Sequence, residues 1–292
     1  MAASLLAPIV VLGTLYGFYY LLLALGFTLL LGISRVLNVA YGALYMATAY
    51  FVFYLNIQEG VNLVIANIIA AGVAVAAGLI IFLVCSKFAP DPMRFLIVSF
   101  LFALLFQYLF SYYFGGQLGT VIPGIISKKE ILLFDVSVPP ALLVLVGVSL
   151  GLLFLLWAWI DWTDYGRTVR ATAEDPETAG LFGIRVRSVY LTVVAVSSAL
   201  VAIAAVLVVP TQELSPSMWV EPFVIAFVVS VVGGLEKFKW TVPAAFLLSF
   251  CQEAVTILYP TSSGLPDIVA FAVAIAFIIL LPKGMGGIRH GS

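Results

Sequence analysis

The sequence predicts an all-α protein that crosses a membrane many times, and three observations indicate this class. Of the 292 residues, 64% are hydrophobic and only 9% are charged, whereas a soluble domain carries about 25% charged residues. The apolar runs are continuous, whereas a membrane β-barrel would show short segments of alternating hydrophobicity. One long polar stretch, 161–187, interrupts these runs. We therefore expect residues 1–292 to form one transmembrane domain.

Nine apolar segments, within a range of eight to ten, are candidate membrane spans, because a span needs about 20 residues. The segments are 8–33, 39–56, 62–86, 95–114, 138–160, 188–209, 218–235, 241–259 and 267–281. The second and seventh border glycine or proline, so each is also compatible with a broken or re-entrant helix. The last segment is short enough to be tilted or partly interfacial.

The positions of lysine and arginine predict the orientation, because these residues are enriched in cytoplasmic loops. If the N-terminus is outside, eleven of them fall on the inner side of nine spans and only Lys128 and Lys129 fall outside. This bias places the stretch 161–187 and the C-terminus in the cytoplasm. The outer segment 115–137 is then a solvated connector, which is also long enough to meet an external partner.

The polar stretch 161–187 carries the local signals of two short helices with a sharp bend between them. Asp175 suits an N-cap, Pro176 the first helical position and Glu177 the first turn. Gly183 suits the position just after a helix C-terminus, where a left-handed backbone is common. We expect a first helix over 165–174 and a second that continues over 178–182.

This predicted helix pair is either a solvated connector or a docking element for a soluble partner. Arg170 and Glu174 are four residues apart, so we expect them to pair along one helical face. Small residues leave room for a second surface to approach closely. These residues are Ala171, Ala173, Ala179 and Gly180.

Polar residues inside the apolar segments are the candidates for a transport pathway, because such residues are costly in a membrane. Glu253 either lines a pathway or forms an interhelical hydrogen bond. Glu221 suits the outer membrane interface, and Gln107 suits a hydrogen bond between helices. Asn38 precedes a helix start and suits an N-cap.

Several motifs of enzymes are absent from the sequence. There is no G-x-x-x-x-G-K-[ST] phosphate loop, so we do not expect this chain to hydrolyse ATP. Cys85 and Cys251 lie in apolar runs, and His290 is the one histidine. We therefore expect no cofactor, metal or catalytic site in this chain. The net charge of −1 is uninformative about nucleic acid, but the sequence has no basic tail or patch, so we expect no nucleic-acid partner.

Four stretches of the chain resemble one family of transport proteins. The first is Arg170-Ala171-Thr172-Ala173-Glu174-Asp175 followed by Ala179, Leu181 and Gly183-Ile184. The others are Leu37-Asn38-Val39-Ala40-Tyr41-Gly42-Ala43-Leu44-Tyr45-Met46, then Val231-Val232-Gly233-Gly234-Leu235, then Pro282-Lys283-Gly284. In order and spacing they resemble the permeases of ABC importers for branched-chain amino acids, over nearly the whole chain.

The chain departs from the pattern of this family at two places. Tyr41 stands where the family commonly has histidine, and 235–240 replaces a glycine-rich turn. These departures affect the expected local turn geometry and any contact that needs the histidine.

The resemblance implies a subunit that moves branched-chain or similar hydrophobic amino acids across a prokaryotic cell membrane. The implied partners are two cytoplasmic ABC ATPases that bind ATP and Mg²⁺, a second homologous permease chain and an external solute-binding protein. The implied ATPase-coupling residues are Arg170, Ala171, Glu174, Asp175, Ala179, Leu181 and Gly183. The candidate pathway residues are Asn38, Tyr41, Gly42, Tyr45 and Glu253.

Two alternatives stay open at this point. A stand-alone channel or secondary transporter would use Glu253 or Glu221 for ion or proton coupling. A permease of the same family for urea or short amides would keep the predicted coupling stretch and carry a different solute.

Overall fold

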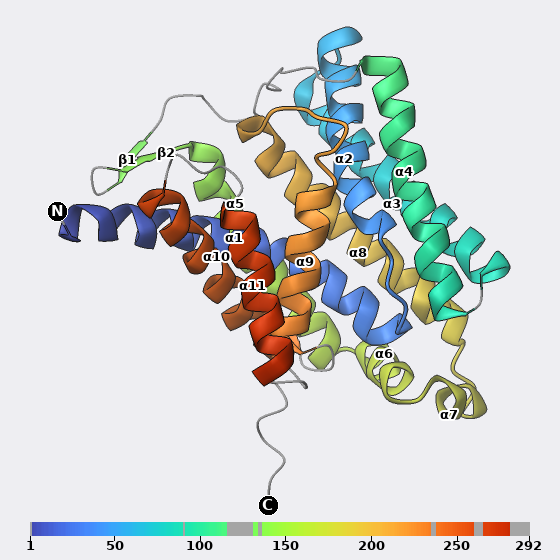
Figure 1. The fold of residues 1–292 in the computed structure, drawn as a ribbon. Helices are drawn as coiled ribbons and strands as arrows, with labels where there is room; N and C mark the ends of the chain where they lie inside the picture. Colours follow the sequence, from blue (N-terminus) through green and yellow to red (C-terminus); the bar gives the residue numbers. More distant parts are fainter. Residues whose placement is uncertain are drawn as a thin grey trace, which may run out of the picture.

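Each of the nine predicted apolar segments coincides with a helix in the computed structural model, which describes residues 2–89, 91–115, 131–133, 136–234, 238–259 and 265–280 (Figure 1). These helices are α1 (Ala2–Ser34), α2 (Ala40–Phe53), α3 (Leu63–Phe88), α4 (Pro92–Phe114), α5 (Pro140–Trp162), α8 (Val186–Val208), α9 (Val220–Gly233), α10 (Thr241–Leu258) and α11 (Leu265–Leu280). Helices α6 (Asp164–Glu174) and α7 (Pro176–Leu181) form the polar stretch. The chain is thus a helical, polytopic membrane protein.

Six helices of the described residues are long and apolar enough to cross a membrane, namely α1, α3, α4, α5, α8 and α10. Helices α2 and α9 have 14 residues each and α11 has 16. A 14-residue helix is about 21 Å long, shorter than a hydrocarbon core of about 30 Å. A π-helical turn, η1 (Tyr54–Gln58), extends α2. The predicted orientation stays a prediction, and the motif at 282–284 lies outside the described residues.

Local signals set several helix starts. The side chain of Asn62 accepts a hydrogen bond from the Val64 amide and caps α3 at 2.9 Å. Pro92 and Pro140 begin α4 and α5, where a missing N–H costs nothing because that group has no partner within the helix. Short 3-10 turns, η2 (Val209–Thr211) and η3 (Phe238–Trp240), follow α8 and precede α10.

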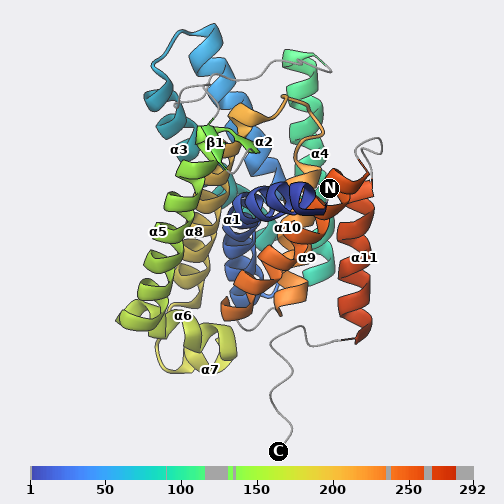
Figure 2. The same ribbon diagram turned by 90° about the vertical axis from the view of Figure 1, so that its left-hand side faces the viewer.

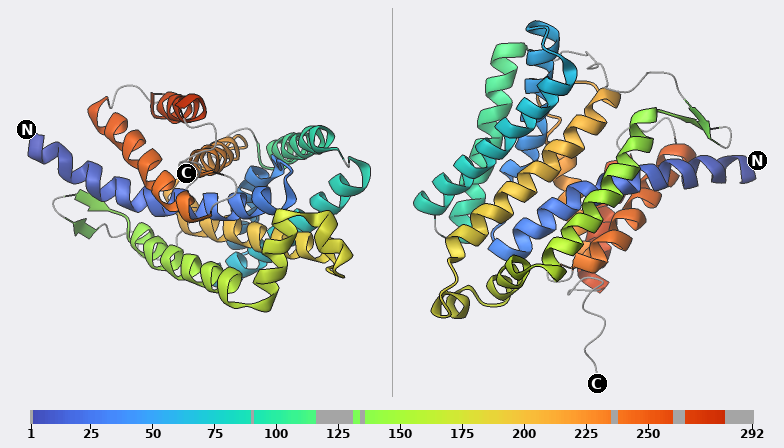
Figure 3. Two further views of the ribbon diagram at one scale, coloured as in Figure 1. Left: turned by 90° about the horizontal axis from the view of Figure 1, so that it is seen from below. Right: turned by 180° about the vertical axis from the view of Figure 1, so that it is seen from behind.

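Helix α1 is the centre of the bundle. It packs against α5, α8, α9 and α10, and Figure 2 shows it between these helices. Leu21, Leu22, Leu23 and Leu25 are completely buried, as expected of a helix that is apolar on every side. The first turns of α1 project from the bundle (Figures 1 and 3), and Leu6 is exposed there.

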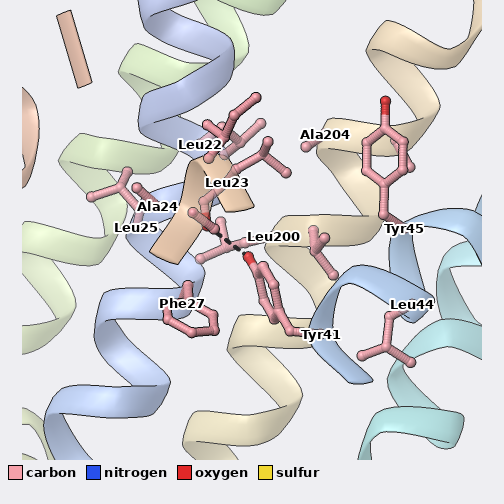
Figure 4. Packing of buried hydrophobic residues seen from close by; sticks show 14 of the residues in the cluster. Leu22, Leu23, Ala24, Leu25, Phe27, Tyr41, Leu44, Tyr45, Leu200 and Ala204 are labelled. Atoms are coloured by element: carbon pink, nitrogen blue, oxygen red, sulfur yellow. Dashed lines mark hydrogen bonds between the residues drawn. The ribbon is translucent and has the colours of Figure 1, made fainter. Parts of the chain in front are cut away.

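Helix α2 packs closely on α1 and α9. The hydroxyl group of Tyr41 donates to the Leu23 carbonyl at 2.8 Å (Figure 4). A Cβ atom at Gly42 would lie 2.4 Å from the Trp219 carbonyl oxygen and 2.7 Å from Cβ of Phe223. Gly42 is therefore required for the close approach of α2 to α9.

The predicted outer connector contains a small sheet that was not expected from the sequence. Strands β1 (Ile131–Leu133) and β2 (Val136–Val138) pair antiparallel, with Ile131 opposite Val138. Three-residue strands carry too little alternation for a periodicity argument to detect them. Lys128 and Lys129 lie outside the described residues.

Candidate functional site

Helices α6 and α7 lie at the end of the bundle where α1 and α5 finish (Figures 1 and 3). Helix α6 begins at Asp164, one residue before the predicted start. The Thr163 side chain accepts a hydrogen bond from the Gly166 amide at 2.9 Å and caps the helix. The chain thus turns from α5 into α6 at Thr163, which caps the second helix.

Asp175 forms the bend between α6 and α7, which confirms the predicted N-cap. Its Oδ1 atom accepts hydrogen bonds from the amides of Glu177 and Thr178 at 3.0 and 3.2 Å. The Thr178 hydroxyl group donates to Oδ2. These bonds stabilise the carboxylate and lower the pKa of Asp175 from its ordinary value. The bond from the Thr178 hydroxyl group has the largest effect.

Gly183 ends α7 in the left-handed conformation, with φ of 83°, as predicted. The Gly183 amide donates to the Gly180 carbonyl at 3.0 Å, and the Ile184 amide donates to the Ala179 carbonyl at 3.2 Å. This pair of bonds is a Schellman motif. The second helix is therefore fixed at both of its ends by local hydrogen bonds.

The tip of α7 presents two apolar side chains to solvent. Leu181 is 87% exposed and Phe182 is 83% exposed. Ala179 faces the other way and is only 4% exposed. Leu181 is among the coupling residues that the family resemblance implies, whereas Phe182 is not, although an apolar residue directly before a C′ glycine is itself a usable signal. This adjacent exposed pair, on a helix fixed at both ends, is a candidate docking surface.

The predicted pairing of Arg170 with Glu174 is wrong. The guanidinium group of Arg170 instead contacts Oδ1 of Asp161 at 2.9 Å and also donates to the Ile160 carbonyl. The last carbonyl groups of a helix have no partner within it, and cations are favoured there. Arg170 therefore secures α6 against the end of α5.

Arg35, one of the eleven basic residues predicted on the inner side, also contacts this region. Its Nη2 atom donates to the carbonyl oxygens of Ala173 and Glu174, both at 2.9 Å. Near the start of α6, the hydroxyl groups of Tyr165 and Thr192 are 2.8 Å apart. Helix α6 is thus tied to the end of α1 and to α8.

The pathway candidates near the start of α2 are buried inside this chain. Asn38 is 3% exposed, Tyr41 is 1% exposed and Tyr45 is fully buried. Oδ1 of Asn38 accepts from the Ala40 amide at 3.1 Å, and Tyr45 donates to Oε1 of Gln212 at 3.1 Å. Their role in a pathway stays a prediction.

The other polar candidates lie on separate helices. Glu253 is half-buried on α10, and Glu221 is exposed in the first turn of α9. Gln107 accepts a hydrogen bond from Nε1 of Trp219 at 2.7 Å, which confirms the predicted hydrogen bond between helices. The structure brings the coupling candidates together in α6 and α7, whereas the pathway candidates lie on or beside α2 and on α10.

Among the described residues, no three or more His, Cys, Asp and Glu side chains gather in a way that could hold a metal ion.

Comparisons with known proteins match nearly the whole chain. The family described as "Branched-chain amino acid transport system / permease component" matches residues 9–281. The chain is 26% identical to the high-affinity branched-chain amino acid transport system permease protein LivH of Escherichia coli K12, over 94% of this chain and 93% of that protein. It is 25% identical to the corresponding permease protein BraD of Pseudomonas aeruginosa, over 94% of each.

One solved structure has a similar fold. PsaBC from Streptococcus pneumoniae in complex with Fab aligns with a TM-score of 0.60, over 97% of each chain and with 13% sequence identity. At this identity, the likeness concerns the fold alone.

Proposed function

Because the chain belongs to the family of permease components of branched-chain amino acid transport systems, we propose that it forms part of the membrane pathway of an ATP-driven importer. It is a multi-pass membrane protein and a transport subunit of an ABC system, not an enzyme. The proposed solutes are branched-chain or similar hydrophobic amino acids.

The exposed apolar tip of α7 is the observation that carries this proposal. Leu181 and Phe182 project from a helix whose two ends are fixed by hydrogen bonds. Such a short, pre-ordered element loses little conformational freedom when it binds. In the proposed complex, both side chains enter an apolar pocket of a cytoplasmic ATPase, and the family implies an ATPase partner.

In the proposed mechanism, α6 and α7 act as a lever between the ATPase and the spans. Closure of two ATPases on ATP displaces the docked tip, and the displacement reaches α5 and α8, which flank the lever in the chain. The pathway then opens alternately to each side of the membrane. ATP can drive this exchange only if the ATPase contacts differ between the two states.

The proposed assembly has two permease chains, two ATPases and an external solute-binding protein. The second permease is a homologue or another copy of this chain. ATP and Mg²⁺ bind to the ATPases, because this chain has no phosphate loop. The binding protein selects the solute, so the pathway itself needs no tight site.

In the proposed orientation, α6 and α7 are cytoplasmic, the N-terminus is outside and the C-terminus is inside. The placement of lysine and arginine supports it. Exposed aromatic residues support the position of the membrane boundaries: Tyr112 and Tyr113 lie at the end of α4, and Trp157 and Trp162 lie towards the opposite end of the bundle, on α5. Aromatic belts of this kind are typical of membrane interfaces.

The test is ATP hydrolysis and solute uptake by the reconstituted assembly, with a binding protein loaded with leucine, valine or urea. We expect the loaded binding protein to stimulate ATP hydrolysis, and the best ligand identifies the solute. Stimulation should be lost when Leu181 and Phe182 are both replaced by serine. It should be kept when Tyr112 and Tyr113 are both replaced by serine. Uptake by this chain alone, without an ATPase, would overturn the proposal in favour of a channel or secondary transporter.

A further inference from the structure

The non-helical connection between α1 and α2 begins at Arg35, and its backbone there is unusual. Arg35 has φ of 53° and is the one residue other than glycine with positive φ among those that the structure describes. Its amide still donates to the Leu31 carbonyl at 2.9 Å. An arginine rarely adopts this conformation, which is found where surrounding contacts hold it.

The Arg35 side chain supplies such contacts. Nη2 donates to the carbonyl oxygens of Ala173 and Glu174, both at 2.9 Å. These carbonyls belong to the last turn of α6, whose carbonyl oxygens have no N–H donors within the helix and which carries the negative end of the helix dipole. Arg35 also lies close enough to Asp175 to help lower the pKa of that carboxyl group. One side chain therefore joins the bend of the α6–α7 lever to the end of the central helix.

The residues after Arg35 are held by contacts with other helices. The Val39 amide donates to Oγ of Ser99 on α4 at 3.1 Å. Asn38 is buried and bonds the first amide of α2. Gly42 then places α2 directly against the Trp219 backbone. Because buried, closely packed elements shift as units, a movement of Arg35 would move the start of α2.

We propose that Arg35 is a positioning residue that transmits movement of the α6–α7 lever to the α1–α2 connection. This inference rests on the proposed function and adds to it a second route into the spans, beside the covalent links to α5 and α8. The route reaches the segment that holds Asn38, Tyr41 and Tyr45, so ATP-driven docking acts directly on the start of α2.

The test compares Arg35→Gly and Arg35→Lys in the reconstituted assembly. Glycine tolerates positive φ, so Arg35→Gly removes the side chain without straining the backbone. Lysine keeps the positive charge, but its compact ammonium group lacks the planar, forked arrangement of N–H donors of a guanidinium group. Arg94→Gln is the matched control. Arg94 pairs with Asp91 on the surface, so this substitution removes a positive charge at a different place.

The measured quantity is solute taken up per ATP hydrolysed, together with the amount of ATPase that co-purifies. For Arg35→Gly we expect normal co-purification and basal hydrolysis, with uptake per ATP lower by roughly fivefold or more. Arg35→Lys should lie between this variant and the wild type, and Arg94→Gln should equal the wild type.

The outcomes separate this inference from the proposed function. If wild-type uptake needs the ATPase and Arg35→Gly retains full uptake per ATP, the inference is overturned and the proposed function stands. If Arg35→Gly fails to assemble, an Arg35→Lys variant with full assembly and wild-type uptake per ATP would equally overturn it. If wild-type uptake is independent of the ATPase, both are overturned.

Discussion

The amide of Ile184 donates to the carbonyl oxygen of Ala179 at 3.2 Å and closes the last turn of α7 around Gly183. This bond directs the chain back towards α8 while Leu181 and Phe182 stay outside. The geometry of the proposed docking surface therefore depends on one left-handed residue.

Replacing Gly183 with valine should loosen α7. A side chain in the left-handed conformation costs about 1–2 kcal/mol, and we expect amide hydrogen exchange in α7 to become about five- to thirtyfold faster. Gly180→Ala is the control, because a Cβ atom there meets nothing within 4 Å and alanine favours the helix. Unchanged exchange in Gly183→Val would mean that the Schellman motif does not hold α7.

Replacing Phe182 with serine should weaken ATPase binding. Burial of such a side chain contributes about 1.5–3 kcal/mol, so we expect the Kd for the ATPase to rise about ten- to a hundredfold. Membrane insertion should be normal, because Phe182 is 83% exposed and supports no packing in the chain. Tyr112→Ser, at the other end of the bundle, should leave the Kd unchanged. An equal Kd for Phe182→Ser would exclude this residue from the interface.

Replacing Gly42 with alanine should destabilise the bundle. The added Cβ atom would lie 2.4 Å from the Trp219 carbonyl oxygen, and backbone cannot move aside as a flexible side chain does. Overpacking of this kind costs about 1–3 kcal/mol, which thermal unfolding in detergent detects as a lower midpoint. Gly72→Ala on α3 meets nothing within 4 Å and should unfold like the wild type. Equal midpoints for both variants would contradict the close contact of α2 with α9.

The bend at Asp175 should be sensitive to acid. Hydrogen bonds lower its folded pKa below 3.8, so its contribution to stability is present above the unfolded value and is lost as pH falls through the folded pKa. We expect a carboxyl NMR titration midpoint below 3.8 and no effect on α7 near neutral pH. Asp175→Asn keeps a side-chain oxygen that can cap the helix but removes the titrating carboxyl group. In that variant, α7 should therefore not respond to acid. A midpoint at or above 3.8 would contradict the observed hydrogen bonds.

Local chemistry explains what could be predicted from the sequence. The nine helical segments follow from the length of apolar runs, and the caps at Asp175 and Gly183 follow from bonds within a few residues. It was predictable that Gln107 forms a hydrogen bond to another helix, because a polar side chain inside a span needs a partner. Its partner Trp219, 112 residues away, was not predictable.

The sequence alone determined the class of protein, the helical segments, the caps of the α6–α7 region and the family, because these depend on hydrophobic length and on short-range bonding. Only the tertiary structure decided which distant groups meet. Arg170 bonds Asp161 in place of Glu174, and Arg35 bonds carbonyl groups that lie 138 and 139 residues further along the chain. Such contacts depend on how α1, α5 and α6 finish at one end of the bundle, and no local pattern encodes that arrangement.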